Sequence, residues 1–430
     1  MSQTSPDDIT IRYRGFTVPS LVDETLREGV ERGFFTVDVE SLYRLFSAQV
    51  TAGLREFVLG CGPEDPALYR VVCTKKDQGL LPAEVRPVFL VLLNCWEATY
   101  ANFSRLPRAW LAETVFSFGM ITHRQQEQLF GRVVDHFVAL GAQELKASIL
   151  CNFAHGVDAQ AYETICAQIA WARRLGVRTI RINDSVGQLY PESTVVLCQQ
   201  LRRDFPDLTF CLHCHNDRGL ALANQLSSLY AGCQMAEGAL CGFGNRAGVT
   251  PLEQLVAICQ DKQIQLGEVP LDLQQLCQAA QLAEETFQQL PHVYRPVSGL
   301  FVHKANFGVL NILDFLEAGG VRDYFLNAAN LHPTTISRAL EAHGFAQAKV
   351  HDPAFIATVQ AAVGDALARR HRGCPEQYRV QMQSLLGWYA HAQLSVQDIV
   401  QIAQSVAWDG ARAATQQQPS ADGRHVALAG

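Results

Sequence analysis

The feature that most constrains the fold is a regular alternation of short apolar segments and amphipathic segments between Val18 and Asp261. The repeat is roughly 30 residues long, enough for one strand, one helix and two short connections. Strands are expected at residues 21–25, 56–60, 86–93, 114–119, 144–151, 179–185, 208–215 and 235–242. Helical patterns lie between them, among others at residues 39–52, 123–140, 161–175, 192–205, 219–231 and 251–260.

Several of these helical patterns end at a glycine, a residue that commonly terminates helices: Gly53, Gly141, Gly176 and Gly232. Eight strands, most of them followed by a helix, predict an α/β fold of the (β/α)8 TIM-barrel type rather than an open sheet. Amphipathic patterns continue at residues 273–290, 335–343, 353–370, 375–392 and 396–414, which predicts a mostly helical C-terminal region.

Two histidines stand at the end of the seventh predicted strand. His213 and His215 are two residues apart. Side chains alternate between the faces of a strand, so both project from the same face, about 7 Å apart along the chain. Neutral imidazoles bind divalent transition metals, and an added carboxylate completes a set that leaves positions open for a substrate. The alternative is a structural pair of hydrogen-bonded core histidines.

The same strand carries Cys211 and Cys214, whose spacing also occurs in zinc knuckles and redox pairs. Residues three apart in a strand lie on opposite faces, and no second pair with this spacing follows, so neither site is favoured.

A basic and an acidic residue, Arg27 and Glu28, follow the first predicted strand. Strands one and seven both end at the mouth of the barrel, so Glu28 is positioned to complete a metal site with the two histidines. Arg27 then stands beside the metal, where a fixed cation stabilises an enolate or oxyanion. The alternative is an ion pair at the barrel end.

Composition excludes several classes of function. A net charge of −7 gives no basic surface for nucleic acid. No apolar run approaches the roughly 18 residues of a membrane span, and the N-terminus is polar and acidic. The 13 cysteines are scattered, as in a cytoplasmic chain with reduced thiols. We expect an N-terminal extension at 1–17, a catalytic barrel at 18–270, a linker with a helical subdomain at 271–415 and a disordered tail at 416–430.

Four motifs in order resemble the DRE-TIM metallolyase superfamily: DETLREG at 23–29, NDSVG at 183–187, HCHNDRGLALAN at 213–224 and GFGNRAGVTPL at 242–252. This superfamily includes homocitrate, isopropylmalate and citramalate synthases and the hydroxymethylglutaryl-CoA lyases. The resemblance implies that Glu28, His213 and His215 bind a divalent metal. It also implies that Arg27 steadies the enolate or the substrate carbonyl, and that Ser185 helps hold the oxo-acid carboxylate.

Some positions divide the superfamily or depart from its pattern. Val249 stands where many members have a metal-binding asparagine. Homocitrate synthases have an aliphatic residue there, followed by Thr-Pro-Leu as at 250–252 here, so the resemblance favours the homocitrate synthase branch. Residues 294–305 resemble the synthases' linker, whose histidine for proton transfer is replaced here by Gly308. His303 and Tyr324 are candidate substitutes, although His303 also fits a plain hydrogen-bonded linker residue.

Other departures concern the oxo acid. Glu31 replaces a usual glutamine, and Leu150 with Cys151 replaces an acidic pair of homocitrate synthases. Strands two to four are rich in apolar and aromatic residues, which indicates a larger or less charged substrate side chain than that of 2-oxoglutarate.

The leading hypothesis is therefore a metal-dependent Claisen-type acyltransferase that condenses acetyl-CoA or a related acyl-CoA with a 2-oxo acid. It implies one divalent ion (Mg, Mn or Zn), small-molecule substrates and a homodimer. The rivals are an aldol lyase of the same superfamily, a metal-dependent hydrolase and a catalytically weakened family member. The sequence leaves the metal, the oxo acid, the general base and the direction of reaction open.

Overall fold

A computed structural model of the chain describes residues 15–120, 126–151, 153, 156–302, 304–306 and 323–416. For residues 120, 126, 151, 304–306, 323, 324, 330 and 407–416 it describes the backbone alone. The chain divides into two compact units, Met1–Gln360 and Ala361–Gly430. The domain boundaries expected from the sequence stay a prediction.

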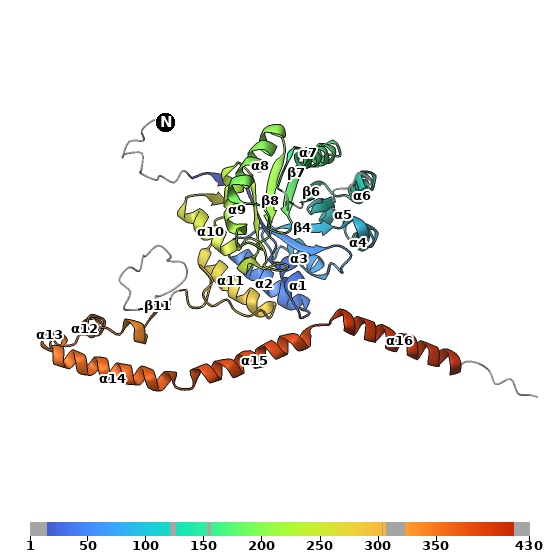
Figure 1. Cartoon of the computed structure of the whole chain (residues 1–430). Coiled ribbons are helices and arrows are strands. Elements are labelled where there is room, and N and C mark those ends of the chain that lie inside the picture. The colour runs from blue at the N-terminus through green and yellow to red at the C-terminus, as the bar shows by residue number, and fades with distance from the viewer. Residues whose placement is uncertain are drawn as a thin grey trace, which may run out of the picture. The chain divides into compact units, whose positions relative to one another are not determined.

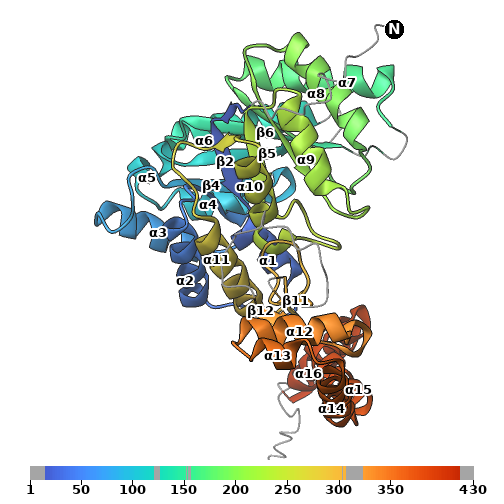
Figure 2. The ribbon, with the colours of Figure 1, turned by 90° about the vertical axis from the view of Figure 1, so that its left-hand side faces the viewer.

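The first unit contains a closed barrel of eight parallel strands in sequential order, β2 to β9 (Figures 1 and 2). The strands are β2 (Ser20–Asp23), β3 (Glu56–Cys61), β4 (Arg86–Val91), β5 (Val115–Met120), β6 (Glu144–Cys151), β7 (Thr179–Asp184), β8 (Thr209–Cys214) and β9 (Met235–Gly238). Pairing of Ser20 with Met235 through Asp23 with Gly238 closes the barrel. The predicted TIM-barrel fold is confirmed.

Helices surround the barrel on its outer side (Figure 1). They are α1 (Thr25–Arg32), α2 (Val39–Thr51), α3 (Ala67–Asp77), α4 (Trp96–Phe103), α5 (Arg108–Ala112), α6 (Gln126–Leu140), α7 (Ala159–Arg174), α8 (Pro191–Asp204), α9 (Ala221–Tyr230), α10 (Leu252–Asp261) and α11 (Leu273–Thr286). The predicted glycine stops are confirmed: Gly141 and Gly232, for example, follow α6 and α9 with φ of 119° and 98°, where a residue with Cβ is strained.

Aromatic residues of the strands pack outward against these helices. Phe57 on β3 lies 4.7 Å, between ring centroids, from Phe46 on α2. Phe89 on β4 lies 4.6 Å from Phe103 on α4. The inward face of strands β2 to β5 instead carries small aliphatic residues, among them Val58 and Val88. The aromatic residues of these strands therefore pack against the outer helices, and the expectation of a larger or less charged substrate side chain stays a prediction.

The last predicted strand is shorter than expected. β9 ends at Gly238, whereas the sequence suggested 242. The chain turns after Ala239 because Cys241 and Gly242 adopt φ of 62° and 64°. This turn brings Thr250 back to the barrel, where the Ala239 amide donates to the Thr250 carbonyl over 3.0 Å.

Outside the barrel, β1 (Thr17–Val18) pairs with β10 (Gln265–Leu266), and β11 (Lys304–Asn306) pairs with β12 (Asp323–Phe325). The C-terminal region is helical as predicted, with α12 (Pro333–Ala342), α13 (Gln347–Val350), α14 (Pro353–His371), α15 (Cys374–Ala392) and α16 (Val396–Gln416). Within the described part of the chain, no helix combines the length and apolarity of a membrane span. The predicted tail at 416–430 lies almost entirely outside the described residues.

Candidate active site and metal centre

The sequence DETLREG folds into a strand end followed directly by a helix. The Asp23 carboxylate accepts hydrogen bonds from the Thr25 amide (3.0 Å) and hydroxyl (2.7 Å). The Thr25 hydroxyl oxygen in turn accepts from the Leu240 amide over 2.8 Å. These bonds fix the start of α1, so its first turn presents Arg27 and Glu28 at the mouth of the barrel.

The structure brings Glu28, His213 and His215 together. One ligand atom of each lies within 4.8 Å of the others. Glu28 and His213 are 1% and 5% exposed, and the Oε1 atom of Glu28 lies 3.6 Å from the Nε2 atom of His213. The rings of the two histidines are 5.1 Å apart between centroids. Spatial proximity of this set, expected from the strand alternation, is thus observed, and its role in metal binding stays a prediction.

These residues fit a divalent metal. Burial, reinforced by Arg181, holds the pKa of His213 well below 6.5. Burial, reinforced by Arg246, lowers that of His215 to about 4. Both imidazoles are therefore neutral and have a lone pair to offer. The Nδ1 atom of His215 is buried and has no hydrogen-bond partner among the described residues. Such an unsatisfied atom is costly unless a ligand occupies it.

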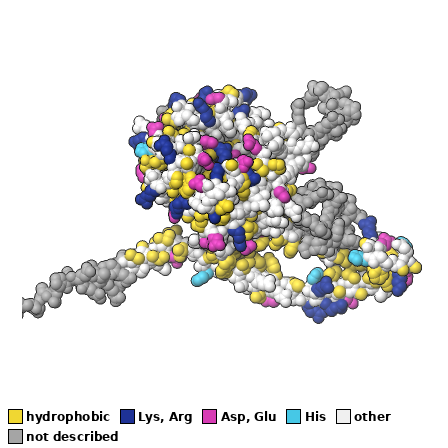
Figure 3. Space-filling model, turned by 180° about the vertical axis from the view of Figure 1, so that it is seen from behind, with side chains coloured by type: hydrophobic (Ala, Val, Ile, Leu, Met, Phe, Trp, Pro, Cys, Tyr) yellow, Lys and Arg dark blue, Asp and Glu magenta, His cyan; other side chains and the backbone are white. Residues whose placement is uncertain are grey.

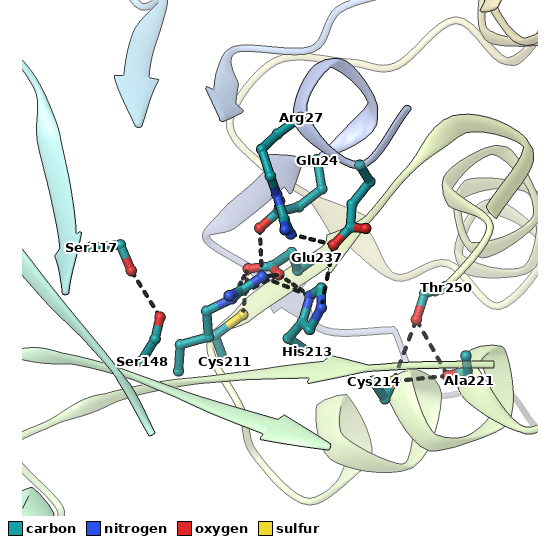
Figure 4. Close-up of polar contacts among 12 residues, drawn as sticks. Glu24, Arg27, Ser117, Ser148, Cys211, His213, Cys214, Ala221, Glu237 and Thr250 are labelled. Atoms are coloured by element: carbon teal, nitrogen blue, oxygen red, sulfur yellow. Dashed lines mark hydrogen bonds and ion pairs between the residues drawn. The ribbon is translucent and has the colours of Figure 1, made fainter. Parts of the chain in front are cut away.

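Arg27 lies against this set (Figure 4). Its guanidinium forms ion pairs with Glu24 (2.7 Å), with Glu31 (2.9 Å) and with Glu28, and its side chain is only 10% exposed. Three carboxylates thus fix the cation in direction and place. A cation preorganised in this way stabilises negative charge that develops on a nearby oxygen.

A second layer of charge lies beneath the histidines, and sequence reasoning missed it. Glu237 on β9, Arg181 on β7 and Lys146 on β6 are 2%, 3% and 2% exposed. Arg181 links Glu237 to Glu24, with 2.5 Å between its Nη2 atom and the Oε1 atom of Glu24. A signal for this cluster was present in the sequence, since each of the three predicted strands carries a charged residue among apolar ones. Buried charges occur almost only in pairs, so these residues could have been expected to meet inside the barrel.

A cavity of about 230 Å³ opens at this end of the barrel. One side is polar and is lined by Arg27, Glu28, Arg181, Ser185, His213, His215 and Arg246. The opposite side is formed by Leu90, Leu92, Ser117, Gly119, Ser148 and Leu150. The buried hydroxyls of Ser117 and Ser148 bond to each other over 2.9 Å. Ser185 therefore lines the same cavity as the candidate metal ligands, as the resemblance implied.

The structure also shows where the side chains of Val249, Cys211 and Cys214 lie. Val249 is 2% exposed and forms a backbone bridge with His215, so it offers no side-chain ligand atom. Cys211 contacts Glu237 inside the barrel, whereas Cys214 contacts the carbonyl of Ala221 on α9 outside it. The two thiols therefore point to opposite faces of β8 and form no joint site.

The candidate bases lie outside the side chains that the structure describes. His303 and Gly308 lie outside them. Tyr324 is on β12, where the structure describes the backbone and not the side chain. Their roles stay predictions.

Comparison with known proteins agrees with the barrel and its motifs. The HMGL-like family model matches residues 111–283. The homocitrate synthase of Sulfolobus acidocaldarius is 35% identical over 178 residues, which are 39% of this chain and 37% of the relative. That of Saccharolobus solfataricus is 35% identical over 168 residues, or 36% of each chain. Residues 111–283 thus match the HMGL-like family, in agreement with the DRE-TIM metallolyase superfamily that the four motifs resemble.

The matches span little more than a third of these curated relatives. Among solved structures, the HMG-CoA lyase of Bacillus subtilis superposes on this chain with a TM-score of 0.52 and 16% identity, covering 65% of this chain and 96% of that one. The lyase of Pseudomonas aeruginosa gives 0.51 and 16%, covering 64% and 95%. At this identity the likeness concerns the fold alone.

Proposed function

We propose that the protein is a metal-dependent acyltransferase that joins acetyl-CoA, or a related acyl-CoA, to a 2-oxo acid by a Claisen-type condensation. The observation that carries the proposal is the placement of Arg27 against Glu28, His213 and His215 at one wall of a cavity. This combination unites a chelating set with a fixed cation, which are the two electrostatic elements that an enolate reaction needs.

In this scheme Glu28, His213 and His215 hold one divalent ion, which would polarise the ketone of the oxo acid. The Ser185 hydroxyl binds the oxo-acid carboxylate from the same side of the cavity. Arg27 stabilises the enolate oxygen formed when a base removes a methyl proton from the acyl-CoA. His303 and Tyr324 are the proposed candidates for that base.

We further propose an oxo acid other than 2-oxoglutarate. The cavity wall opposite the candidate metal ligands offers two hydroxyls, Ser117 and Ser148, between the aliphatic side chains of Leu90 and Leu150. No lysine or arginine of β4, β5 or β6 lines this cavity among the described residues. A second carboxylate there loses its hydration without gaining a cation, which is unfavourable. A short, uncharged side chain fits better.

The test is a mass-spectrometric assay of the purified protein with Mg, Mn or Zn, acetyl-CoA and a panel of 2-oxo acids. Water hydrolyses the thioester of the condensed product, so we expect metal-dependent release of CoA together with a 2-hydroxy dicarboxylic acid. We also expect faster turnover of uncharged oxo acids than of 2-oxoglutarate. Arg27→Gln is expected to lower the rate by two or more orders of magnitude, as removal of an oxyanion donor does.

Absence of CoA release with every oxo acid contradicts the proposal. Cleavage of a 3-hydroxy acid by the same metal-loaded protein then assigns an aldol lyase, which the replacement of the linker histidine by Gly308 favours. Inactivity in both directions assigns a weakened family member.

We also propose that the protein is a homodimer. Large apolar side chains are exposed on α15 and α16 (Figure 3), among them Leu386, Val396 and Ile399 at 56%, 78% and 59%. Exposed apolar surface of this kind is typical of protein interfaces. Light scattering coupled to size-exclusion chromatography tests this, and a monomeric mass over the micromolar range contradicts it.

A further inference from the structure

The imidazole of His213 has a carboxylate on the side away from Glu28. Its Nδ1 atom lies 2.6 Å from the Oε1 atom of Glu237 (Figure 4). Its Nε2 atom is the one that faces Glu28. Glu237 is on β9, the strand adjacent to β8 in the barrel. The ring is thus held between two buried carboxylates, one on each nitrogen.

Glu237 itself is fixed from three directions. The Nε atom of Arg181 donates to both of its carboxylate oxygens, over 2.9 and 3.0 Å. The ammonium of Lys146 lies 3.3 Å from Oε2, and the Cys211 thiol donates to the same oxygen over 3.5 Å. Two buried cations paired with one carboxylate favour its ionised form and hold it in place.

An ionised acceptor at Nδ1 determines where the imidazole carries its proton. A neutral ring has one N–H and one lone pair. Donation from Nδ1 to Glu237 leaves the lone pair on Nε2, next to Glu28. Arg181 also approaches Nδ1, with its Nη2 atom at 2.7 Å. A hydrogen bond from Arg181 to Nδ1 would require the proton on Nε2 and would remove the lone pair there. The negative charge of Glu237 decides between these two tautomers.

We propose that Glu237 is a positioning residue that fixes His213 as the Nδ1–H tautomer and directs its Nε2 lone pair to a metal shared with Glu28 and His215. Arg181 and Lys146 hold Glu237 for this task. The inference rests on the metal centre of the proposed function. Carboxylate partners of this kind orient metal-binding histidines and raise their basicity.

A competing arrangement exists on the same residues. Glu24, His213 and Glu237 also place ligand atoms within 4.8 Å of one another. The guanidinium of Arg181 contacts all three, so a cation of the protein occupies this position. A metal ion there would be repelled by Arg181 and would compete with it for both carboxylates. We therefore assign Glu237 to orientation and not to direct ligation.

The decisive variant is Glu237→Gln, which keeps the size of the side chain and removes its charge. We expect the Kd of the full-length protein for Zn²⁺, measured by competition with a chelating dye, to rise about 10- to 100-fold. Lys146→Met removes one of the two cations that hold this carboxylate. It is expected to raise the Kd less than Glu237→Gln does, because Arg181 still holds Glu237 against the ring. The double variant Glu237→Gln/Lys146→Met removes one charge of each sign and so keeps the net charge of the cluster. It replaces the single variant in the Kd measurement if Glu237→Gln does not fold.

A direct readout comes from ¹⁵N-histidine NMR of the zinc-loaded protein. We expect His213 of the wild type to show a protonated Nδ1 and a metal-bound Nε2, and the signal to change in Glu237→Gln. If the wild type binds no metal, the proposed metal centre itself is wrong. If a folded Glu237→Gln protein has the same Kd and the same His213 tautomer as the wild type, the positioning role alone is overturned. The same holds if Glu237→Gln only lowers the stability of the metal-free protein and leaves the Kd unchanged. Two zinc ions per wild-type chain, or a metal-bound Nδ1, assign Glu237 as a ligand instead and also overturn it.

Discussion

At the scale of single residues, the barrel mouth contains more charge than its burial would normally permit. Glu24, Glu28, Glu237 and Arg181 are each at most 3% exposed, and each lies next to a group of opposite charge. Removing one partner from such a set leaves the other uncompensated in a medium that solvates it poorly. Variants here need controls that separate loss of chemistry from loss of structure.

Glu28→Ala, His213→Ala and His215→Ala are each expected to reduce bound metal from the proposed one ion per chain to substoichiometric amounts, because each removes one of the three proposed protein ligands. Elemental analysis after dialysis measures this, with circular dichroism to verify folding. His136→Ala, which removes an exposed histidine on α6, is the matched control. Undiminished metal content in all three variants contradicts the assigned site.

Asp23 makes stability depend on pH. Burial raises its pKa from 3.8 to about 7. The folded state therefore holds a proton that the unfolded state has lost, so the stabilisation is complete below pH 3.8 and disappears as the pH rises through about 7. Relative to Asp23→Asn, which cannot titrate, the wild type is expected to lose unfolding free energy between about pH 5.5 and about pH 7.5.

Urea unfolding at these two pH values measures the difference. Asp38→Asn is the control: Asp38 is exposed, and hydrogen bonds from Ser41 lower its pKa, so it does not titrate in this window. A slope with pH that is the same in the wild type and in Asp23→Asn contradicts the prediction.

At the scale of elements, the packing of α11 on α1 is set by a residue without a side chain. A Cβ at Gly29 of α1 would lie 2.3 Å from the Cε2 atom of Phe287, the residue that ends α11. The ring of Phe287 also packs edge-on against Phe243, 5.7 Å away between centroids. The position of α11 therefore depends on the close approach at Gly29.

Gly29→Ala is expected to destabilise the protein by about 1–3 kcal/mol, because overpacking exceeds the roughly 1 kcal/mol that alanine gains over glycine in a helix. Gly29→Ala/Phe287→Leu is expected to recover part of the loss. Gly131→Ala on α6, where a Cβ finds the nearest atom at 3.7 Å, is the control and is expected to stabilise the protein slightly. Chemical denaturation measures all three, and equal effects at Gly29 and Gly131 contradict the argument.

At the scale of the whole molecule, a buried ion cluster joins the end of the barrel to the segment that follows α11. Arg295 pairs with Glu284 on α11 at 2.6 Å and with Glu253 on α10 at 3.6 Å. Ser298 completes the cluster through a bond of 2.8 Å to Glu253. The segment around residue 295 is thereby held against two helices of the barrel unit.

Arg295→Ala is expected to cost about 3–5 kcal/mol of unfolding free energy, because it leaves two carboxylates buried without their cation. Arg44→Ala is the control: Arg44 on α2 pairs over 3.2 Å with Glu285 of α11, the residue next to Glu284, and this exposed pair contributes about 0–1 kcal/mol. Thermal and urea unfolding compare the two. Similar losses of unfolding free energy for both variants would contradict the larger contribution expected of the buried Arg295 cluster.

The sequence by itself determined the order of the strands and helices and the grouping of Glu28 with His213 and His215. Both follow from local rules: a strand alternates its faces, so His213 and His215 share one, and parallel strands of a barrel end at one mouth, so Glu28 meets them. The ends of α6 and α9 near Gly141 and Gly232 also follow from a local rule, because only glycine adopts the positive φ of these positions without strain.

Only the tertiary structure decided which distant side chains meet. Lys146, Arg181 and Glu237 come from β6, β7 and β9, and no spacing along the chain predicts that they converge beneath His213. The same holds for the serine pair of β5 and β6 and for the close approach of Phe287 to Gly29. Register, barrel closure and helix packing set these contacts. They depend on the burial of many residues at once, whereas the motifs depend on the few residues that compose them.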